Sequence, residues 1–230
     1  LQNSFQSHRQ DSYFGLNSYD IHQKSWYGNL IYNSIIGNTQ HKFATGLSGT
    51  YDDYNEQLTT SALAGDFSRI DRSVGAFFEY TYDNSSNFSF VAGIRADSHN
   101  NLGNFITPRF HLRYNPWKEA TFRLSAGRGK RAANVIAENQ QLLASSRQLH
   151  IIGGDGGKLY GLNPEIAWNY GASFLQAFKI WGKNAELSVD FYRTHFDNQV
   201  VVDLDHSPQQ ALFYNLDGKS FANSFQTFEC

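Results

Sequence analysis

Residues 105–128 hold the feature that most constrains the fold: two runs in which apolar and polar side chains alternate with a period of two. The even positions of the first run are apolar: Ile106, Phe110, Leu112 and Tyr114. Its odd positions are polar and mostly cationic: Thr107, Arg109, His111 and Arg113. After a connection at 115–119 the second run repeats the pattern, with Phe122, Leu124 and Ala126 against Arg123, Ser125 and Gly127. This period indicates strands with one apolar face. We predict a hairpin that pairs Leu112 with Phe122, Phe110 with Leu124 and His111 with Arg123.

Alternation alone does not distinguish a soluble sheet from a membrane-spanning one, but the composition narrows the choice. The 230 residues include 19 Phe, 13 Tyr and 4 Trp against 4 Pro and no Met, which favours strands over helices. The mean hydropathy is −0.50, and no apolar run approaches the roughly 18 residues of a transmembrane helix. The low mean hydropathy does not exclude a transmembrane barrel, because every second residue of its strands is polar. The net charge of −2 gives no reason to expect a nucleic-acid partner.

The ends of the chain and its one cysteine limit other inferences. Cys230 has no partner for an internal disulfide or for a pair of metal ligands. The chain begins at Leu1 without a methionine or a signal peptide, and it ends within a strand-like run. We interpret it as an internal fragment, so the lack of a targeting segment carries no information about its compartment.

The alternation extends along most of the chain and predicts an all-β protein of about ten strands. We place them at 1–14, 22–36, 39–53, 71–82, 88–98, 105–114, 120–131, 164–181, 184–203 and 210–229. Short connections fall at 37–38, 83–87, 115–119 and 182–183, and longer ones at 54–70, 99–104, 132–163 and 204–209. Gly37-Asn38 and Gly182-Lys183 suit hairpins of type II′. Short turns at one end and long loops at the other are typical of an outer-membrane barrel.

Aromatic residues gather next to the short turns. They are Tyr82, Phe88, Tyr114, Trp117, Phe178 and Trp181. This placement favours a girdle at a membrane interface, and the alternative is the general preference of aromatics for strands. Within the longest connection, 132–147 has roughly helical spacing, and Gly153 to Gly157 form a glycine-rich loop.

No motif indicates catalysis, a cofactor or a resident metal. The run 127–131 (GRGKR) lacks the Gly-Lys-Ser/Thr ending of a phosphate loop. Asp52, Asp53 and Glu56 are oxygen ligands that a cation could use, but a solvated acidic loop is the favoured interpretation. The histidines lack the spacing of a zinc site, and no nucleophile elbow is present. We therefore predict that the protein is not an enzyme.

Charged side chains share the polar parity of the predicted strands. The set comprises Arg95, Arg109, His111, Arg113, Arg123 and Glu165. Burial of such groups in a soluble core is unfavourable unless they are paired, whereas the lumen of a water-filled or plugged barrel accommodates them. We predict that they face a lumen, and the outer surface of a soluble sandwich remains an alternative.

Several segments resemble the barrel of TonB-dependent outer-membrane receptors, particularly those of the Bacteroidetes. The segments are 107–114 (TPRFHLRY), 122–129 (FRLSAGRG), 162–170 (LNPEIAWNY) and 191–199 (FYRTHFDNQ). The resemblance implies a barrel of about 22 strands closed by an N-terminal plug. It implies active import of a scarce nutrient (siderophore-bound iron, haem, cobalamin or another metal complex) with energy delivered through the TonB complex. Residues 1–230 would form a partial barrel domain, without the plug, the TonB-contacting segments and the ends of the barrel.

We therefore predict an antiparallel meander within a large transmembrane β-barrel of the bacterial outer membrane. Its partners would be outer-membrane lipid, a small nutrient ligand, the plug of the same chain and the TonB complex. Ligand-contacting candidates lie in or near the long loops: the cationic Arg128, Arg131 and Arg147, and the aromatic Tyr51, Tyr54 and Tyr160. The alternatives are a soluble β-sandwich or lectin-like binding module, and a passive porin or an outer-membrane enzyme. The sequence does not identify the ligand.

Overall fold

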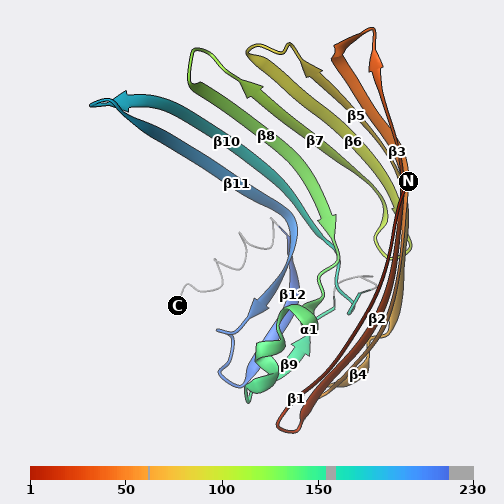
Figure 1. Cartoon of the computed structure of the whole chain (residues 1–230). Coiled ribbons are helices and arrows are strands. Elements are labelled where there is room, and N and C mark those ends of the chain that lie inside the picture. Colours follow the sequence, from red (N-terminus) through yellow and green to blue (C-terminus); the bar gives the residue numbers. More distant parts are fainter. Residues whose placement is uncertain (62, 154–158, 218–230) are drawn as a thin grey trace.

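The computed structural model describes residues 1–61, 63–153 and 159–217, and over these residues the chain forms one curved sheet of 12 strands (Figure 1). All but two short strands belong to an antiparallel meander, which confirms the predicted fold class. Its members are β1 (Gln2–Phe14), β2 (Asn17–Ile36), β3 (Asn38–Thr59), β5 (Arg69–Asp83), β6 (Phe88–His99), β7 (Gly103–Tyr114), β8 (Ala120–Arg131), β10 (Glu165–Ile180), β11 (Lys183–Asp203) and β12 (Gln210–Asp217). Of the strand predicted at 210–229, residues 218–229 lie outside the described residues, as do the glycines at 154–157.

Two short strands and two helical turns lie outside the meander, at its long-loop end. Strand β4 (Ala64–Asp66) pairs with the end of β3, and β9 (Gln148–Ile151) pairs with β12. The β9–β12 pair is parallel, which corrects the expectation that sequence-adjacent antiparallel pairs make up the whole sheet. The predicted helix at 132–147 is present only as α1 (Val135–Glu138) and the 3₁₀ turn η1 (Gln140–Ala144). Figure 1 shows α1 and β9 within the curve of the sheet, at the end opposite the short turns.

Strands β2 and β3 extend further toward the long-loop end than the pattern predicted. β2 begins at Asn17, directly after the turn Gly15-Leu16, in which Gly15 has a φ of 67°. β3 continues to Thr59, so 54–59 is strand and the predicted loop at 54–70 is shorter. The reason is mutual pairing, because Ser18 lies opposite Thr59 and the two extensions satisfy each other's backbone groups.

The predicted hairpin of β7 and β8 is present with a register two residues away from the expected one. Leu112 lies opposite Leu124, and His111 lies opposite Ser125. The connection after Tyr114 contains a turn of its own, in which the Ala120 amide donates to the Trp117 carbonyl at 3.2 Å. The first pair next to the connection is therefore Tyr114 and Phe122. A shift of two residues leaves every side chain on its predicted face.

The β10–β11 turn also differs by one position. Its central residues are Trp181 and Gly182, with φ angles of 49° and 77°, so the turn is of the I′ class rather than the expected II′. Gly182 adopts positive φ at no steric cost, whereas Trp181 does so with a Cβ that resists it. The Trp181 side chain is 97% exposed, so no packing contact within the described structure explains this conformation.

The two faces of the sheet differ in chemistry as predicted. One face, called here the apolar face, exposes large hydrophobic side chains across many strands, among them Phe5, Leu30, Leu47, Phe78, Ile94, Phe110, Leu124 and Val189. Such a continuous exposed surface is what lipid contact requires. The other face, the polar face, carries Arg109, His111, Arg113 and Arg123. No helix in the described part of the chain is long and apolar enough to cross a membrane.

Aromatic rings form contacts along the short-turn end of the apolar face. The ring centroids of Tyr82 and Phe88 are 6.2 Å apart, and those of Phe88 and Tyr114 are 6.4 Å apart. Trp26, opposite Tyr51, and the stacked pair Trp168 and Tyr170 lie nearer the long-loop end.

The soluble-sandwich alternative requires a second sheet packed on the apolar face. Every strand between residues 1 and 217 that the structure describes belongs to a single sheet, and Leu124 is 39% exposed. A sandwich would bury Leu124 between two sheets. The fold is therefore not a sandwich.

Candidate functional site

The long connection between β8 and β10 folds over the polar face at the long-loop end. We call its described residues, 132–153 and 159–164, the cap. The cap buries Val135, Ile136 and Leu143 against Tyr19 of β2 and Leu58 of β3. Its apolar residues and the inward side chains of the first strands thus form the principal buried cluster of the described structure.

Polar contacts tie the cap to both edges of the sheet. The Gln10 side-chain amide donates to Gln140 Oε1 at 2.9 Å, and Asn17 donates to the Leu143 carbonyl at 2.8 Å. At the other edge β9 pairs with β12, so the cap spans from the first strands to the last one. It therefore crosses the concave side of the sheet instead of extending away from it.

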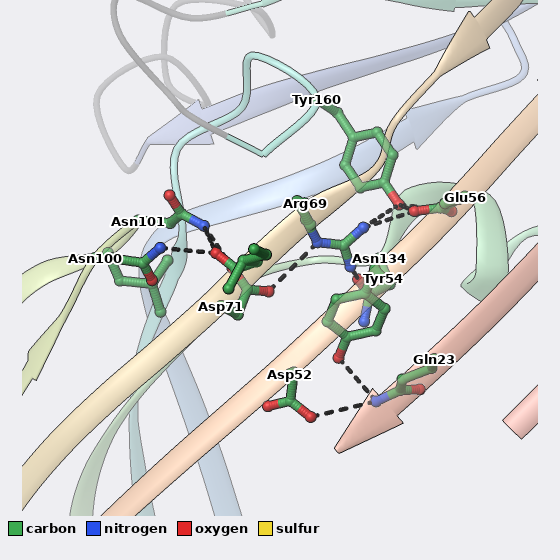
Figure 2. A network of polar contacts seen from close by, with 12 residues as sticks. Gln23, Asp52, Tyr54, Glu56, Arg69, Asp71, Asn100, Asn101, Asn134 and Tyr160 are labelled. Carbon is green, nitrogen blue, oxygen red and sulfur yellow. Dashed lines mark hydrogen bonds and ion pairs between the residues drawn. The ribbon is translucent and has the colours of Figure 1, made fainter. Parts of the chain in front are cut away.

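The cap is fastened by a buried polar cluster that we call the hub (Figure 2). At its centre is Glu56, which is fully buried at the end of β3. Its carboxylate accepts hydrogen bonds from the Tyr19 hydroxyl at 2.9 Å and the Tyr160 hydroxyl at 2.7 Å. It also accepts from Arg69 Nη1 at 2.6 Å, as a buried ion pair. Three donors from two strands and the cap therefore share one carboxylate.

Arg69, the first residue of β5, uses its planar guanidinium to join the other members of the hub. Nε donates to Asp71 at 3.3 Å, and Nη2 donates to Asn134 Oδ1 of the cap. The guanidinium carbon lies 4.0 Å from the Tyr54 ring centroid and 5.5 Å from that of Tyr160. Arg69 therefore holds the cap at two points, Asn134 and Tyr160, and contacts two rings through cation–π interactions.

The surroundings of Tyr160 in the hub keep its phenol neutral. Burial, and then the negative charge of Glu56, raise the pKa of Tyr160 above its ordinary value. The neutral hydroxyl is the form that donates to the carboxylate. Because hydrogen bonds to charged groups in a dry site are the strong ones, the bond from Tyr160 to Glu56 contributes substantially to holding the cap.

The structure brings two of the six predicted ligand-contacting residues together and separates the other four. Tyr54 and Tyr160 flank Arg69 in the hub. Tyr51 is on the apolar face, opposite Trp26. Arg128 donates to the Ile106 carbonyl at 3.3 Å, next to the point where β7–β8 pairing stops at Arg109 and Gly127.

The remaining two arginines contact carboxylates or carbonyls of the chain. Arg131 pairs with Glu138 of α1 at 2.9 Å and with Glu165 of β10 at 2.6 Å, and its side chain is 60% exposed. Arg147 Nη1 donates to the carbonyls of Leu204, Ser207 and Gln210, at 2.6, 3.0 and 3.0 Å. Arg147 thereby fixes the cap to the connection between β11 and β12.

The six side chains predicted to face a lumen all lie on the polar face. Arg95 pairs with Asp97 at 2.6 Å and donates to Ser48, and Arg109 pairs with Glu79. Glu165 is the partner of Arg131. The other three, His111, Arg113 and Arg123, occupy adjacent positions of β7 and β8.

Sequence reasoning missed the role of Glu56 and Arg69. The acidic cluster at 52–56 was expected to be a solvated loop, which is wrong for Glu56, because it lies in β3 and is ion-paired in a buried site. Continuing the alternation of β3 past residue 53 would have placed Tyr54, Glu56 and Leu58 on one face. Within the described ranges, no cluster of three or more His, Cys, Asp or Glu side chains has the geometry to hold a metal ion.

Comparison with known proteins identifies the class to which this sheet belongs. Residues 1–223 match the family described as TonB dependent receptor-like, beta-barrel. The chain therefore belongs to the TonB-dependent receptor family, as the resemblance of its strands implied. Receptors of this family are outer-membrane proteins of Gram-negative bacteria, and the outer membrane is the location of this protein.

Solved structures support the same fold at low sequence identity. A mutant of the ferric enterobactin receptor of Pseudomonas aeruginosa superimposes with a TM-score of 0.56 at 15% identity, over 87% of this chain and 31% of that one. The copper transporter OprC gives a TM-score of 0.58 at 11% identity, over 87% of this chain and 33% of that one. The alcaligin outer membrane receptor of Bordetella pertussis gives 0.56 at 16% identity, over 94% and 37%. The chain thus spans about a third of the length of these structures, and no curated protein sequence matches it.

Proposed function

We propose that the full-length protein is an active importer of a scarce nutrient, such as a ferric siderophore, haem, cobalamin or another metal complex. The observation that carries this proposal is the family match over 1–223 together with a curved sheet that is apolar on one face and polar on the other. The solved structures with the same fold include receptors of ferric enterobactin and alcaligin and a copper transporter.

We place ligand recognition at the long-loop end, on the cap and its neighbouring loops. Recognition residues are commonly presented by loops on a rigid scaffold, and the hub makes the cap a fixed surface. Tyr160 and Arg131 are the predicted contacts best placed there, because both are attached to the cap and Arg131 is partly exposed. Arg147 and Tyr54 support this surface, whereas Tyr51 and Arg128 lie opposite Trp26 and Trp168 on the apolar face.

We further propose that energy reaches the transporter through the TonB complex and a plug domain encoded outside these 230 residues. A passive porin is the competing possibility for a polar lumen of this kind. The two differ in their need for energy, because a porin conducts down a gradient and an active importer stops when the energy supply is removed.

Uptake by a deletion strain tests the proposal. The strain, with and without the full-length gene, would be supplied with ferric siderophores, haem or cobalamin as the limiting nutrient. We expect the gene to restore growth on one source, and a protonophore or loss of TonB to abolish radiolabelled uptake of that source. Restored uptake that persists without TonB would favour the porin, and no difference on any source would contradict nutrient import.

A further inference from the structure

The apolar face carries three arginines toward its long-loop end: Arg72 of β5, Arg128 of β8 and Arg193 of β11. Each lies an even number of residues from an exposed apolar side chain of its own strand and therefore shares its face. Those apolar side chains are Val74, Leu124 and Val189. Arg72 and Arg193 are exposed and Arg128 is half-buried. Over residues 1–61, 63–153 and 159–217, none of the three arginines forms an ion pair.

The three arginines lie about one membrane thickness from the short turns. The outward positions between them and the short turns hold only Ala, Val, Leu, Phe and Tyr. These positions are 74, 76, 78, 80 and 82 in β5, 120, 122, 124 and 126 in β8, and 185, 187, 189 and 191 in β11. Each run covers about 8–11 residues, and a tilted strand crosses the hydrocarbon layer in about 9–11. Since the long loops of such barrels are extracellular, the arginines lie at the level of the outer headgroups.

Aromatic rings accompany the arginines at this level. Arg128 lies opposite Trp168, and Arg193 lies opposite Tyr170. The rings of Trp168 and Tyr170 are stacked, with an interplanar angle of 8° and centroids 6.2 Å apart. Trp and Tyr concentrate at membrane interfaces, so the rings independently indicate the same depth. We call these four residues the β8–β11 patch.

The first strands repeat the combination with a single arginine. Arg72 lies opposite Tyr51, and Tyr51 lies opposite Trp26. We call these three residues the β3–β5 patch. Carboxylates that share this face near the two patches have basic neighbours of their own: Asp197 lies 3.8 Å from His195, and Asp53 lies opposite Lys24.

Completion of the barrel leaves both patches on the outer surface. Further strands join the sheet at its edges, and a plug fills the lumen on the polar side, so neither covers the apolar face. An arginine that faces lipid is costly at mid-membrane and costs little near the interface. Long side chains extend their charged ends toward the headgroups, and phosphate is the headgroup anion whose geometry a guanidinium matches.

We propose that the β8–β11 patch holds a phosphorylated lipid of the outer leaflet, and that the β3–β5 patch holds a second one more weakly. Arg128 and Arg193 bind the lipid phosphate from two strands, each able to do so in a bidentate manner. The stacked rings between them lie beside the upper acyl chains. The β3–β5 patch has one arginine and therefore fewer contacts. This inference rests on the outer-membrane location and not on the transport proposal.

Native mass spectrometry of the full-length protein, delipidated in detergent, tests the inference. Diphosphoryl lipid A is the probe, and the same lipid without its phosphates and inorganic phosphate are the comparison probes. We expect retention of diphosphoryl lipid A alone. Arg128→Gln/Arg193→Gln should weaken retention at the stronger site by about tenfold or more, through the loss of charge-assisted hydrogen bonds. Arg72→Gln should affect only the weaker site. Arg123→Gln is the matched control, because Arg123 is an exposed arginine of the same strand β8 on the polar face.

A second readout separates a lipid site from a structural role of the arginines. Arg193 has no ion pair or hydrogen bond in the described part of the chain, so Arg193→Gln should leave the lipid-free Tm unchanged. Lipid A should raise the Tm of the wild type and of Arg123→Gln, and less that of Arg193→Gln. Arg193→Lys keeps the charge without the planar fork and should retain lipid at an intermediate level.

Four results would overturn the inference. They are equal retention of lipid A with and without phosphates, displacement of lipid A by inorganic phosphate, unchanged retention in Arg128→Gln/Arg193→Gln, and an equal loss in Arg123→Gln. A wild type that retains no lipid A would overturn it as well.

Discussion

The hub predicts that the cap opens far more often when a single hydroxyl is removed from Tyr160. In Tyr160→Phe the ring remains over Arg69, but the Glu56 carboxylate loses one of its three hydrogen-bond donors. A hydrogen bond to a buried carboxylate contributes about 1.5–3 kcal/mol. Taking about 2 kcal/mol, and a factor of ten for each 1.4 kcal/mol, the open population of the cap rises about 30-fold.

Hydrogen exchange measures this opening directly in the full-length protein. The amides of Glu138, Asn139, Leu142 and Ser145 are hydrogen-bonded within the cap and exchange only when it opens. Peptides covering 134–145 should exchange about 30-fold faster in Tyr160→Phe, while peptides of β6 should be unchanged.

Tyr51→Phe is the matched control for this experiment. It removes a tyrosine hydroxyl from β3, the strand that carries Glu56, but on the apolar face, and it should leave hydrogen exchange in the cap unaltered. Equal exchange of 134–145 in the wild type and in Tyr160→Phe, with normal insertion of the barrel, would show that the hub does not hold the cap.

Four further predictions concern the hub, the two faces of the sheet and the β10–β11 turn. Glu56→Gln should destabilise the cap more than Tyr160→Phe, by about 3–5 kcal/mol, because it leaves Arg69 without its closest buried counter-charge; an exchange effect smaller than that of Tyr160→Phe would contradict this. Raising the pH above 10.0, the ordinary pKa of tyrosine, should weaken the wild-type cap. The raised pKa of Tyr160 stabilises the fold below pH 10 and ceases to do so as the pH rises toward the folded-state value; in Tyr160→Phe this part of the pH dependence should be missing from the exchange rates. Val189→Arg on the apolar face should cost about 2–4 kcal/mol in lipid near mid-membrane, whereas Ser188→Arg on the polar face should cost little, as measured by unfolding in vesicles; equal costs would reject the assignment of the faces. Trp181→Asn should relieve roughly 1–2 kcal/mol of left-handed backbone strain in the β10–β11 turn, and lower stability in the same assay would mean that the Trp181 ring contributes more through membrane contact.

The sequence predicted the faces of the sheet well, because facing is a local property. A period of two places Arg109 and Phe110 on opposite sides wherever their strand pairs. The register of the β7–β8 hairpin was not predictable in the same way. A slip of two residues leaves the alternation unchanged, so only the geometry of the 115–119 connection distinguishes the Leu112–Leu124 pair from the Leu112–Phe122 pair.

The candidate site was harder to predict, because its contacts join residues that are distant in the sequence. Gln10 meets Gln140 across 130 positions, and Glu56 meets Tyr160 across 104. No local sequence pattern indicates which distant residues form such pairs. Tyr54 and Tyr160 were selected for their rings alone, and their meeting at Arg69 depends on the cap folding inward over the polar face.

That inward fold also explains why charges are arranged differently at the two ends of the polar face. At the long-loop end the cap excludes water, so every buried charge there needs a partner, and Glu56 and Arg69 pair with each other. Near the short turns Arg113 and Arg123 lie opposite each other on the polar face, and both side chains are exposed within the described part of the chain. Exposed like charges repel only weakly in water, so this pair costs less than the burial of an unpaired charge would. The position of the cap thus determines which charges of the polar face need a buried partner and which do not.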